Sequence, residues 1–339
     1  MKKSLLAVAA LTAFAGVASA QSSVTLFGIV DLSARNVKNG TAGSLKTLST
    51  NGQASSRLGF RGVEDLGGGM RAGFWLEGDI SGDTGGTGQT WQRRSTVSLL
   101  GGFGEVRLGR DYTPTFLSFS AFDPFGYVGV ASPANVRGVF LASGGATTAV
   151  RANNTINYFL PAMGGLYGSV QVAAGEGVQG NKYTGARLGY AAGPLNVTGA
   201  YGKTDKTGTM VDDLTTFVVG ASFNMGFATL QGVYEKADYS TADRKMFTVS
   251  AVVPLGSGNL KAQYTKASGS SAAFDAKQFG VGYVYNLSKR TSLYTNYGSI
   301  KNEGTATTGG RATSSGSGPA FTRGGEKSTG YEFGMRHDF

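Results

Sequence analysis

Residues 247–265 read FTVSAVVPLGSGNLKAQYT, two alternating runs on either side of a turn. The first run is apolar at every second position from Phe247 to Val253. In the second run Lys261, Gln263 and Thr265 alternate with apolar residues, and the turn between the runs is rich in Gly, Ser and Asn. Because side chains alternate between the two faces of a strand, this pattern predicts a β-hairpin with one apolar and one polar face.

The same period of two recurs along almost the whole chain, for example from Val24 to Val30, Phe217 to Phe223 and Phe279 to Tyr285. Seven short turns separate the alternating runs: 65–69, 101–104, 161–165, 192–194, 224–226, 254–259 and 286–289. They join fourteen strands into pairs, and one further strand at each end brings the count to sixteen. Longer, polar connections lie between the pairs: 36–55, 82–89, 175–183, 204–213, 237–244, 267–276 and 302–328.

Short turns at one rim and long loops at the other, with an even number of strands, are typical of a transmembrane antiparallel β-barrel of the outer membrane. A soluble β-sandwich would show the same alternation but would turn its apolar face inward. The composition agrees with a large sheet, since the chain has 55 Gly, 35 Tyr and Phe together, 7 Pro and no Cys. The sequence therefore predicts an all-β barrel whose apolar face meets lipid.

The first twenty residues have the pattern of a cleaved secretory signal. Lys2 and Lys3 precede an apolar core, and Ala18-Ser19-Ala20 forms a small-residue cleavage site. We expect residues 21–339 to form a single barrel domain. No later segment is apolar over the length of a spanning helix, so strands must make any membrane crossing.

One connection is unlike the others. The strands predicted at Glu105–Asp111 and Val150–Phe159 are separated by a segment of about forty residues, roughly 112–150. Loops of that length are usually functional or disordered. This one is rich in aromatic residues: Phe116, Phe119, Phe122, Phe125, Tyr127 and Phe140. We expect it to fold back and pack inside the barrel.

Charge and motifs exclude several functions. Without Lys2 and Lys3, 29 basic side chains face 21 acidic ones, a balance compatible with anionic solutes. His337 is the only histidine, and no metal-ligand cluster, cofactor motif or nucleophile–base pair accompanies it. We therefore expect no catalytic residue, no bound metal or cofactor and no nucleic-acid partner, and we regard an outer-membrane hydrolase as a poor alternative.

The alternation of apolar and polar residues also predicts which basic side chains face the inside of the barrel. If the apolar set faces lipid, the residues between them face water, which places these arginines inside: Arg57, Arg61, Arg71, Arg107 and Arg151. An arginine facing lipid at mid-membrane costs about 2 to 4 kcal/mol, so the argument has force. Arg93 and Arg94 are adjacent and conflict: alternation with Val97 and Leu99 places Arg94 inside, and either a bulge or an arginine at the rim is needed to place Arg93 there.

Six segments in order resemble the general porins of Gram-negative outer membranes, and most of all their beta-proteobacterial, anion-preferring branch. The segments are SVTLFGIVD from Ser23, SSRLGFRGVEDLGGGMRAGFWLE from Ser55, RRSTVSLLGGFGEVRLGRD from Arg93, VRANNTINYF from Val150, YNLSKRTSLY from Tyr285 and GMRHDF at the C-terminus. The resemblance implies a sixteen-stranded barrel, a homotrimer surrounded by outer-membrane lipid and lipopolysaccharide, and a third loop that narrows the pore.

The resemblance further implies that Arg57, Arg93 and Arg151 form a basic ladder opposite the inserted loop, with Arg94 as the second choice for Arg93. Asp111 and Asp123 are the expected counter-charges. At about 5 Å in water each guanidinium attracts an anion by roughly 0.8 kcal/mol. We expect a water-filled diffusion channel for small hydrophilic solutes, anionic or neutral, with a preference for anions. A substrate-specific anion porin, or a surface adhesin that uses loop 302–328, remains an alternative.

Overall fold

The computed structural model describes residues 23–86, 88–137, 147–206, 212–239, 242–270, 275–304 and 325–339. The expected signal segment 1–20, Phe140 of the long loop and most of loop 302–328 lie outside these ranges. In the described part of the chain, no helix is both long enough and apolar enough to cross a bilayer.

The hairpin predicted at residues 247–265 is present. Strand β13 (Ala242–Leu255) pairs antiparallel with β14 (Gly258–Gly269), and the turn between them takes up only residues 256–257. Phe247 and Val249 lie on the outer face, 47% and 40% exposed. Thr248 and Thr265 are fully buried on the inner face, and their hydroxyls lie 2.9 Å apart.

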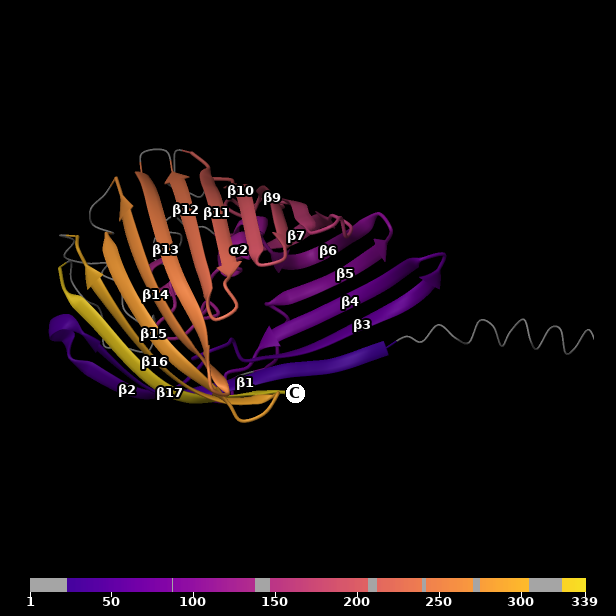
Figure 1. Cartoon of the computed structure of the whole chain (residues 1–339). Coiled ribbons are helices and arrows are strands. Elements are labelled where there is room, and N and C mark those ends of the chain that lie inside the picture. The colour runs from indigo at the N-terminus through magenta and orange to yellow at the C-terminus, as the bar shows by residue number, and fades with distance from the viewer. Residues whose placement is uncertain are drawn as a thin grey trace, which may run out of the picture.

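The other strands repeat this hairpin. They are β1 (Ser23–Asn39), β2 (Ser44–Thr50), β3 (Arg57–Gly67), β4 (Met70–Asp79), β5 (Arg94–Gly101), β6 (Gly104–Tyr112), β7 (Arg151–Phe159), β8 (Leu166–Ala173), β9 (Tyr183–Ala192), β10 (Leu195–Thr204), β11 (Leu214–Asn224), β12 (Thr229–Tyr239), β15 (Ala276–Asn286), β16 (Thr291–Asn302) and β17 (Lys327–Asp338). From β3 to β17 each strand pairs antiparallel with its neighbours in chain order, β2 and β3 both pair with β1, and β1 pairs with β17 to close the barrel (Figure 1). At this seam the backbones of Gly28 and Phe339 exchange two hydrogen bonds of 3.0 and 3.1 Å.

Seventeen strands occupy sixteen positions, as predicted, because β2 and β3 share one. Residues 32–38 of β1 pair with β2, and residues 23–29 pair with β3. Between them, the carboxylate of the fully buried Asp31 accepts the backbone N–H groups of Gly52, Gln53 and Ala54. The predicted loop 36–55 is therefore too long: β1 continues to Asn39, a short 3-10 turn η1 (Gly40–Ala42) follows, and β2 resumes the sheet.

The barrel exposes apolar side chains and encloses polar ones. Phe217 and Val219 of β11 are each 44% exposed, whereas Gln263 and Gln278 are 2% and 0% exposed on the inner face. A soluble protein shows the opposite arrangement, because exposing so much apolar surface to water is unfavourable. The outer wall is therefore suited to lipid, as the alternation indicated.

The long loop folds into the barrel. It begins with α2 (Pro114–Ser120), which lies inside the ring of strands (Figure 1). Phe119 and Phe122 are fully buried against small or apolar side chains that face inward from β10 to β16. A Cβ at Gly220 of β11 would lie 2.3 Å from the Phe122 ring, so this glycine leaves the room that the loop occupies. The aromatic side chains of the loop thus pack it against one side of the barrel wall.

Candidate functional site

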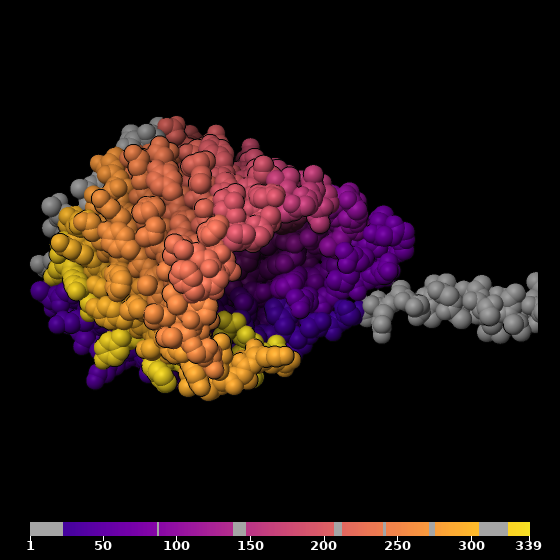
Figure 2. Space-filling view, viewed as in Figure 1, coloured from indigo at the N-terminus to yellow at the C-terminus, as the bar shows by residue number. Residues whose placement is uncertain are grey.

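A cavity of about 570 Å³ separates the loop from the facing wall. Figure 2 shows the molecule hollowed between the purple N-terminal strands and the orange strands beyond them. Residues from both sides line the cavity: Gln53, Ala54, Ser55, Arg57, Arg93, Tyr112, Phe116, Leu117, Ser120, Asp123, Pro124, Gly126, Tyr127, Val150, Arg151, Lys261 and Arg336. Five cationic side chains and one carboxylate are among them.

Arg57, Arg93 and Arg151 come together on one wall of this cavity. Arg57 is the first residue of β3, Arg93 directly precedes β5, and Arg151 is the first residue of β7. Tyr112, the last residue of β6, connects two of them: its hydroxyl accepts hydrogen bonds from Arg93 (3.1 Å) and Arg151 (2.7 Å). The Arg151 guanidinium also lies 4.3 Å from the centre of the Tyr112 ring. Tyr112 therefore holds both guanidinium groups at the cavity.

The conflict between Arg93 and Arg94 has a simple structural origin. Strand β5 begins at Arg94, so the pleat places Arg94 inward with Thr96, to whose hydroxyl it donates at 3.1 Å. Arg93 lies before the strand and is not bound by the alternation. Both arginines face inward, and neither a bulge nor a rim position is needed. Arg94 lies next to a smaller neighbouring pocket, 4.5 Å above the Trp75 ring.

The charge partners of the arginine ladder come from β4 and are not the carboxylates predicted from the sequence. Arg93 forms ion pairs with Glu77 (2.6 Å) and Asp79 (2.9 Å), and Arg57 lies 3.8 Å from Glu77. Their spacing of two residues on a strand is the signal that could have identified them, because it puts both carboxylates on the face of Arg57.

Two cations of the cavity were also missed. Lys261 of β14 donates to the backbone carbonyl of Pro124 at 2.8 Å. Arg336 of β17 reaches the cavity from the barrel seam while bound to Asp338. Both belong to strands far from Arg57 in the sequence, so only the closed barrel shows that they share its cavity.

Besides Arg94, three predicted pore residues do not line the cavity. Arg61 stacks on Phe27 and Trp75, with its guanidinium 5.3 and 5.2 Å from the ring centres. Arg71 is exposed next to the short turn that joins β3 to β4. Arg107 is bound by Glu105 (2.8 Å) and Asp111 (2.6 Å) on its own strand β6. All three lie closer to the short-turn rim of the barrel than the cavity does. Alternation predicts which face of a strand a side chain occupies, but not its position along the barrel axis.

The two predicted counter-charges are also used elsewhere. Asp111 binds Arg107 and lies 3.9 Å from Arg94, away from the ladder. Asp123 borders the cavity, but its carboxylate turns back into the loop and accepts the backbone N–H groups of Phe125 and Tyr127, each at 2.8 Å. Burial raises the pKa of this carboxyl from 3.8 to about 6. The loop face opposite the arginines is therefore mostly apolar.

The loop is bound to the wall along its length. Gln263 and Gln278 donate side-chain amide hydrogens to the carbonyls of Ala131 (2.8 Å) and Ser132 (2.9 Å). Further along, the buried guanidinium of Arg137 pairs with Glu235 of β12 at 2.7 Å. Desolvation lowers the pKa of Arg137, but the charge of Glu235 and the hydrogen bonds to Glu235 and Tyr127 together raise it above its usual value, so this group stays charged. These contacts hold the loop in one position across the pore.

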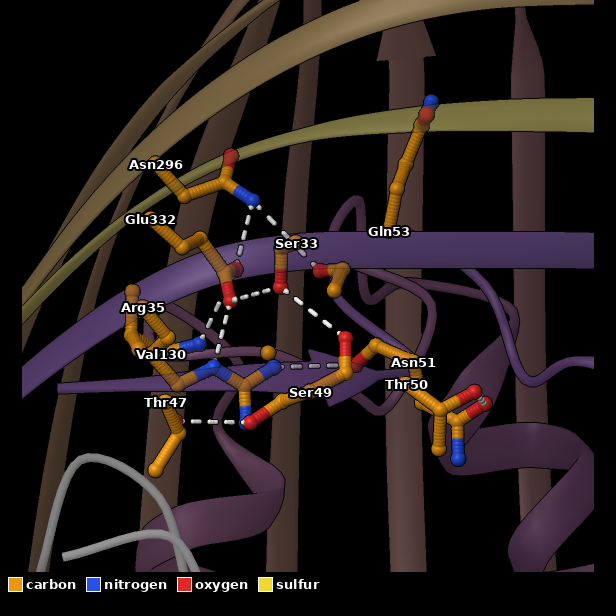
Figure 3. Close-up of polar contacts among 12 residues, drawn as sticks. Ser33, Arg35, Thr47, Ser49, Thr50, Asn51, Gln53, Val130, Asn296 and Glu332 are labelled. Carbon is orange, nitrogen blue, oxygen red and sulfur yellow. Dashed lines mark hydrogen bonds and ion pairs between the residues drawn. The ribbon is translucent and has the colours of Figure 1, made fainter. Parts of the chain in front are cut away.

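A polar network beside the β1–β17 seam holds the middle of the loop (Figure 3). Glu332 of β17 is 1% exposed and accepts hydrogen bonds from Arg35 (2.8 Å), Asn296 (2.9 Å) and the backbone N–H of Val130 (3.2 Å). Figure 3 shows Arg35 and Glu332 on neighbouring strands with Val130 of the loop beside them. The same carboxylate thus joins the barrel seam to the pore loop.

Known proteins share the sequence and the architecture of this chain. A family model described as Gram-negative porin matches residues 7–305. The chain belongs to the Gram-negative porin family. It is 40% identical to outer membrane porin protein 32 of Delftia acidovorans, with 100% of both chains covered. The porin also superimposes on the solved anion-selective porin from Comamonas acidovorans with a TM-score of 0.85 and 38% identity, covering 94% of this chain and 100% of the other.

A more distant relative is also an outer-membrane protein. The major outer membrane protein P.IB of Neisseria meningitidis serogroup B is 28% identical to this porin over 88% of its chain and 93% of the relative. The exposed apolar wall, the closed barrel and the inserted loop are therefore features of an outer-membrane channel. The family assignment does not by itself identify the residues that select solutes.

Proposed function

We propose that this porin is a diffusion channel that prefers small anions, and that Arg57, Arg93 and Arg151 are its selectivity residues. One observation carries the proposal: five cationic side chains line the cavity beside the loop, and the single carboxylate among the lining residues is turned into the loop. Fixed guanidinium groups in a narrow aqueous gap lower the energy of an anion and raise that of a cation.

The relatives support the proposal. A solved relative at 38% identity is itself described as anion-selective. In this porin the ladder residues lie on one wall and the loop closes the other, so a solute that passes the loop must pass the guanidinium groups.

The test is the reversal potential of the reconstituted porin across a KCl gradient. We expect the sign of anion preference, and we expect that changing Arg57, Arg93 and Arg151 together to Gln lowers the chloride-to-potassium permeability ratio by about tenfold or more, since each charge contributes roughly 0.8 kcal/mol. As a charge-matched control, Arg61, Arg71 and Arg107 changed to Gln leave most of the preference. An unchanged ratio in the ladder variant contradicts the assignment.

We further propose that the porin is a homotrimer embedded among outer-membrane lipids and lipopolysaccharide. The family resemblance and the apolar outer wall support this arrangement. Cross-linking of the protein in outer-membrane vesicles tests it: a ladder that ends at three subunits is expected, and a purely monomeric product contradicts it.

A further inference from the structure

A second, smaller cavity of about 280 Å³ adjoins the first inside the barrel. Arg57 and Tyr112 border both cavities. From Arg57 the smaller cavity extends to Phe27 of β1 and Trp75 of β4, which the strand register places two and four positions nearer the short turn that joins β3 to β4. It therefore lies on the short-turn side of the arginine ladder.

Part of this cavity is apolar, although most side chains of the inner wall are polar. Phe27, Ile29 and Trp75 border it, and the ring centres of Phe27 and Trp75 are 4.9 Å apart. The indole Nε1 of Trp75 donates to the carboxylate of Glu77 at 3.1 Å, which fixes the orientation of the indole ring. Apolar surface that faces water in a pore is covered favourably by an apolar part of a ligand.

Two guanidinium groups with unused donors border the same cavity. In the part of the chain that the structure describes, Arg57 donates no hydrogen bond, and the nearest carboxylate oxygen, from Glu77, is 3.8 Å away. Arg94 uses its Nε to donate to the hydroxyl of Thr96 at 3.1 Å, and Asp111 lies 3.9 Å from it. Because a guanidinium carries several N–H donors, both arginines can bind a further acceptor.

The carboxylate that borders the cavity is already engaged. One oxygen of Glu77 accepts from Arg93 at 2.6 Å, and the other accepts from Trp75. The Arg94 guanidinium lies 4.5 Å from the centre of the Trp75 ring, so a cation and an aromatic ring are neighbours here. A ligand that satisfies both carries an anionic group attached to a flat ring, because guanidinium groups bind carboxylates and aromatic rings pack on one another.

We propose that this cavity is a binding subsite for small aromatic carboxylates of the benzoate type. The carboxylate binds Arg57 and Arg94, and the ring packs against Phe27 and Trp75. The volume of about 280 Å³, at the lower end of small-molecule sites of about 300 Å³ and above, limits the ligand to a single ring. The inference rests on the anion channel proposed above and names a class of solute for it.

The two tryptophans of the chain, Trp75 and Trp91, permit a direct binding assay. The full-length porin with Trp91→Phe keeps Trp75 as its only tryptophan, and its fluorescence in detergent is titrated with 4-nitrobenzoate, which quenches indole emission. We expect saturable quenching, and about tenfold or more weaker quenching by the neutral 4-nitrobenzamide, since it lacks the charge that a guanidinium binds most strongly.

Arg94→Gln in this background tests the cation. We expect it to weaken 4-nitrobenzoate binding about fourfold or more, the effect of one charge at about 5 Å in water. Arg71→Gln is the charge-matched control, because Arg71 lies on the same strand as Trp75 but next to the short turn. The control is expected to bind as the Trp91→Phe porin does.

Phe27→Leu tests the ring contact and is expected to weaken binding about threefold or more. Phe74→Leu, on the outer face of β4, is its control and is expected to leave binding unchanged. Benzoate should displace 4-nitrobenzoate at about threefold or more lower concentration than cyclohexanecarboxylate, which has the same charge but no aromatic ring. Heat-modifiable electrophoretic mobility verifies that each variant is folded.

Three results overturn the subsite: quenching that does not saturate, equal quenching by 4-nitrobenzamide, or equal displacement by cyclohexanecarboxylate and benzoate. The KCl reversal potential of the same Trp91→Phe sample separates this inference from the proposed function. Anion preference without saturable quenching refutes the aromatic subsite and leaves the anion channel intact, whereas cation preference contradicts the channel proposal itself.

Discussion

At the scale of single residues, alternation identified the inward position of Arg57 and left Arg93 undecided. The reason is physical: Arg57 is the first residue of the regular strand β3, whereas Arg93 precedes β5, where the pleat does not yet determine direction. The orientation of Asp123 depends on backbone N–H groups within an irregular loop. No pattern in the sequence expresses that geometry, so its predicted role as a counter-charge to the arginines could not be tested before the structure.

Glu77 is one of the two carboxylates that pair with the arginine ladder. Because its carboxylate pairs with Arg93 and lies near Arg57, we expect Glu77→Gln to raise the chloride-to-potassium permeability ratio by about two- to fourfold, the effect of one charge a few ångströms from the ion path. Reversal potentials in KCl gradients measure it. Asp213→Asn, which removes a carboxylate that binds Lys203 on the exposed long-loop side, is the control; a ratio that stays constant in Glu77→Gln refutes the role assigned here.

Asp123 predicts a pH dependence. Its pKa is raised to about 6, so the carboxyl is neutral at pH 5 and ionised at pH 7.5. The new negative charge next to Lys261 should lower anion preference on the order of twofold as the pH rises. The folded state also keeps a proton that the unfolded chain loses, so the contribution of Asp123 to stability falls between about pH 4 and 6. Asp123→Asn is expected to flatten the selectivity profile over this range; a profile as steep as that of the unaltered porin contradicts the assignment.

At the scale of elements, most strands followed from their period of two and from the Gly-rich turns. The exception is β2, whose short run SLKTLST between Gly43 and Asn51 lies inside a segment that the sequence pattern predicts to be a loop. Its pairing with β1 depends on Asp31, which binds the following turn from a strand some twenty residues earlier. Such a contact has no local signature. The insertion of the long loop, by contrast, followed from its unusual length and its aromatic content.

The pair of Arg137 and Glu235 predicts how firmly that loop is held. Both side chains are nearly inaccessible, 1% and 5% exposed, so Glu235→Gln leaves a buried cation without its carboxylate, at a cost of about 3 to 5 kcal/mol. We expect larger fluctuations of single-channel current and faster proteolysis of the loop. The double variant Arg137→Met with Glu235→Gln removes both charges and is expected to restore quiet currents. If the single variant is as quiet as the unaltered porin, this ion pair does not fix the loop.

At the scale of the whole molecule, stability comes from the closed hydrogen-bond ladder, because the chain has no cysteine and its interior is largely polar. Closure depends on the seam, where the ring of Phe339 covers Gly28. A Cβ at Gly28 would lie 2.3 Å from that ring and 2.7 Å from the carbonyl of Arg57. The last residue of the chain therefore packs in space left by a glycine on the first strand.

We expect Gly28→Ala to destabilise the barrel by about 1 to 3 kcal/mol through overpacking at this seam. The temperature at which the folded band is lost in unheated and heated electrophoresis measures the effect. Gly199→Ala is the matched control, since nothing lies within 4 Å of a Cβ at that position on the outer wall. Equal melting of the two variants argues against a role for the seam contact.

The long loop is attached to the wall by side chains, while the ring of strands closes through its own backbone. The barrel and the pore loop are consequently separate structural units. We expect that the loop can be shortened or exchanged while the barrel stays closed. Substitutions confined to this one segment can thus change permeability, and in protein engineering residues 113–150 can be replaced by another loop while the barrel is kept.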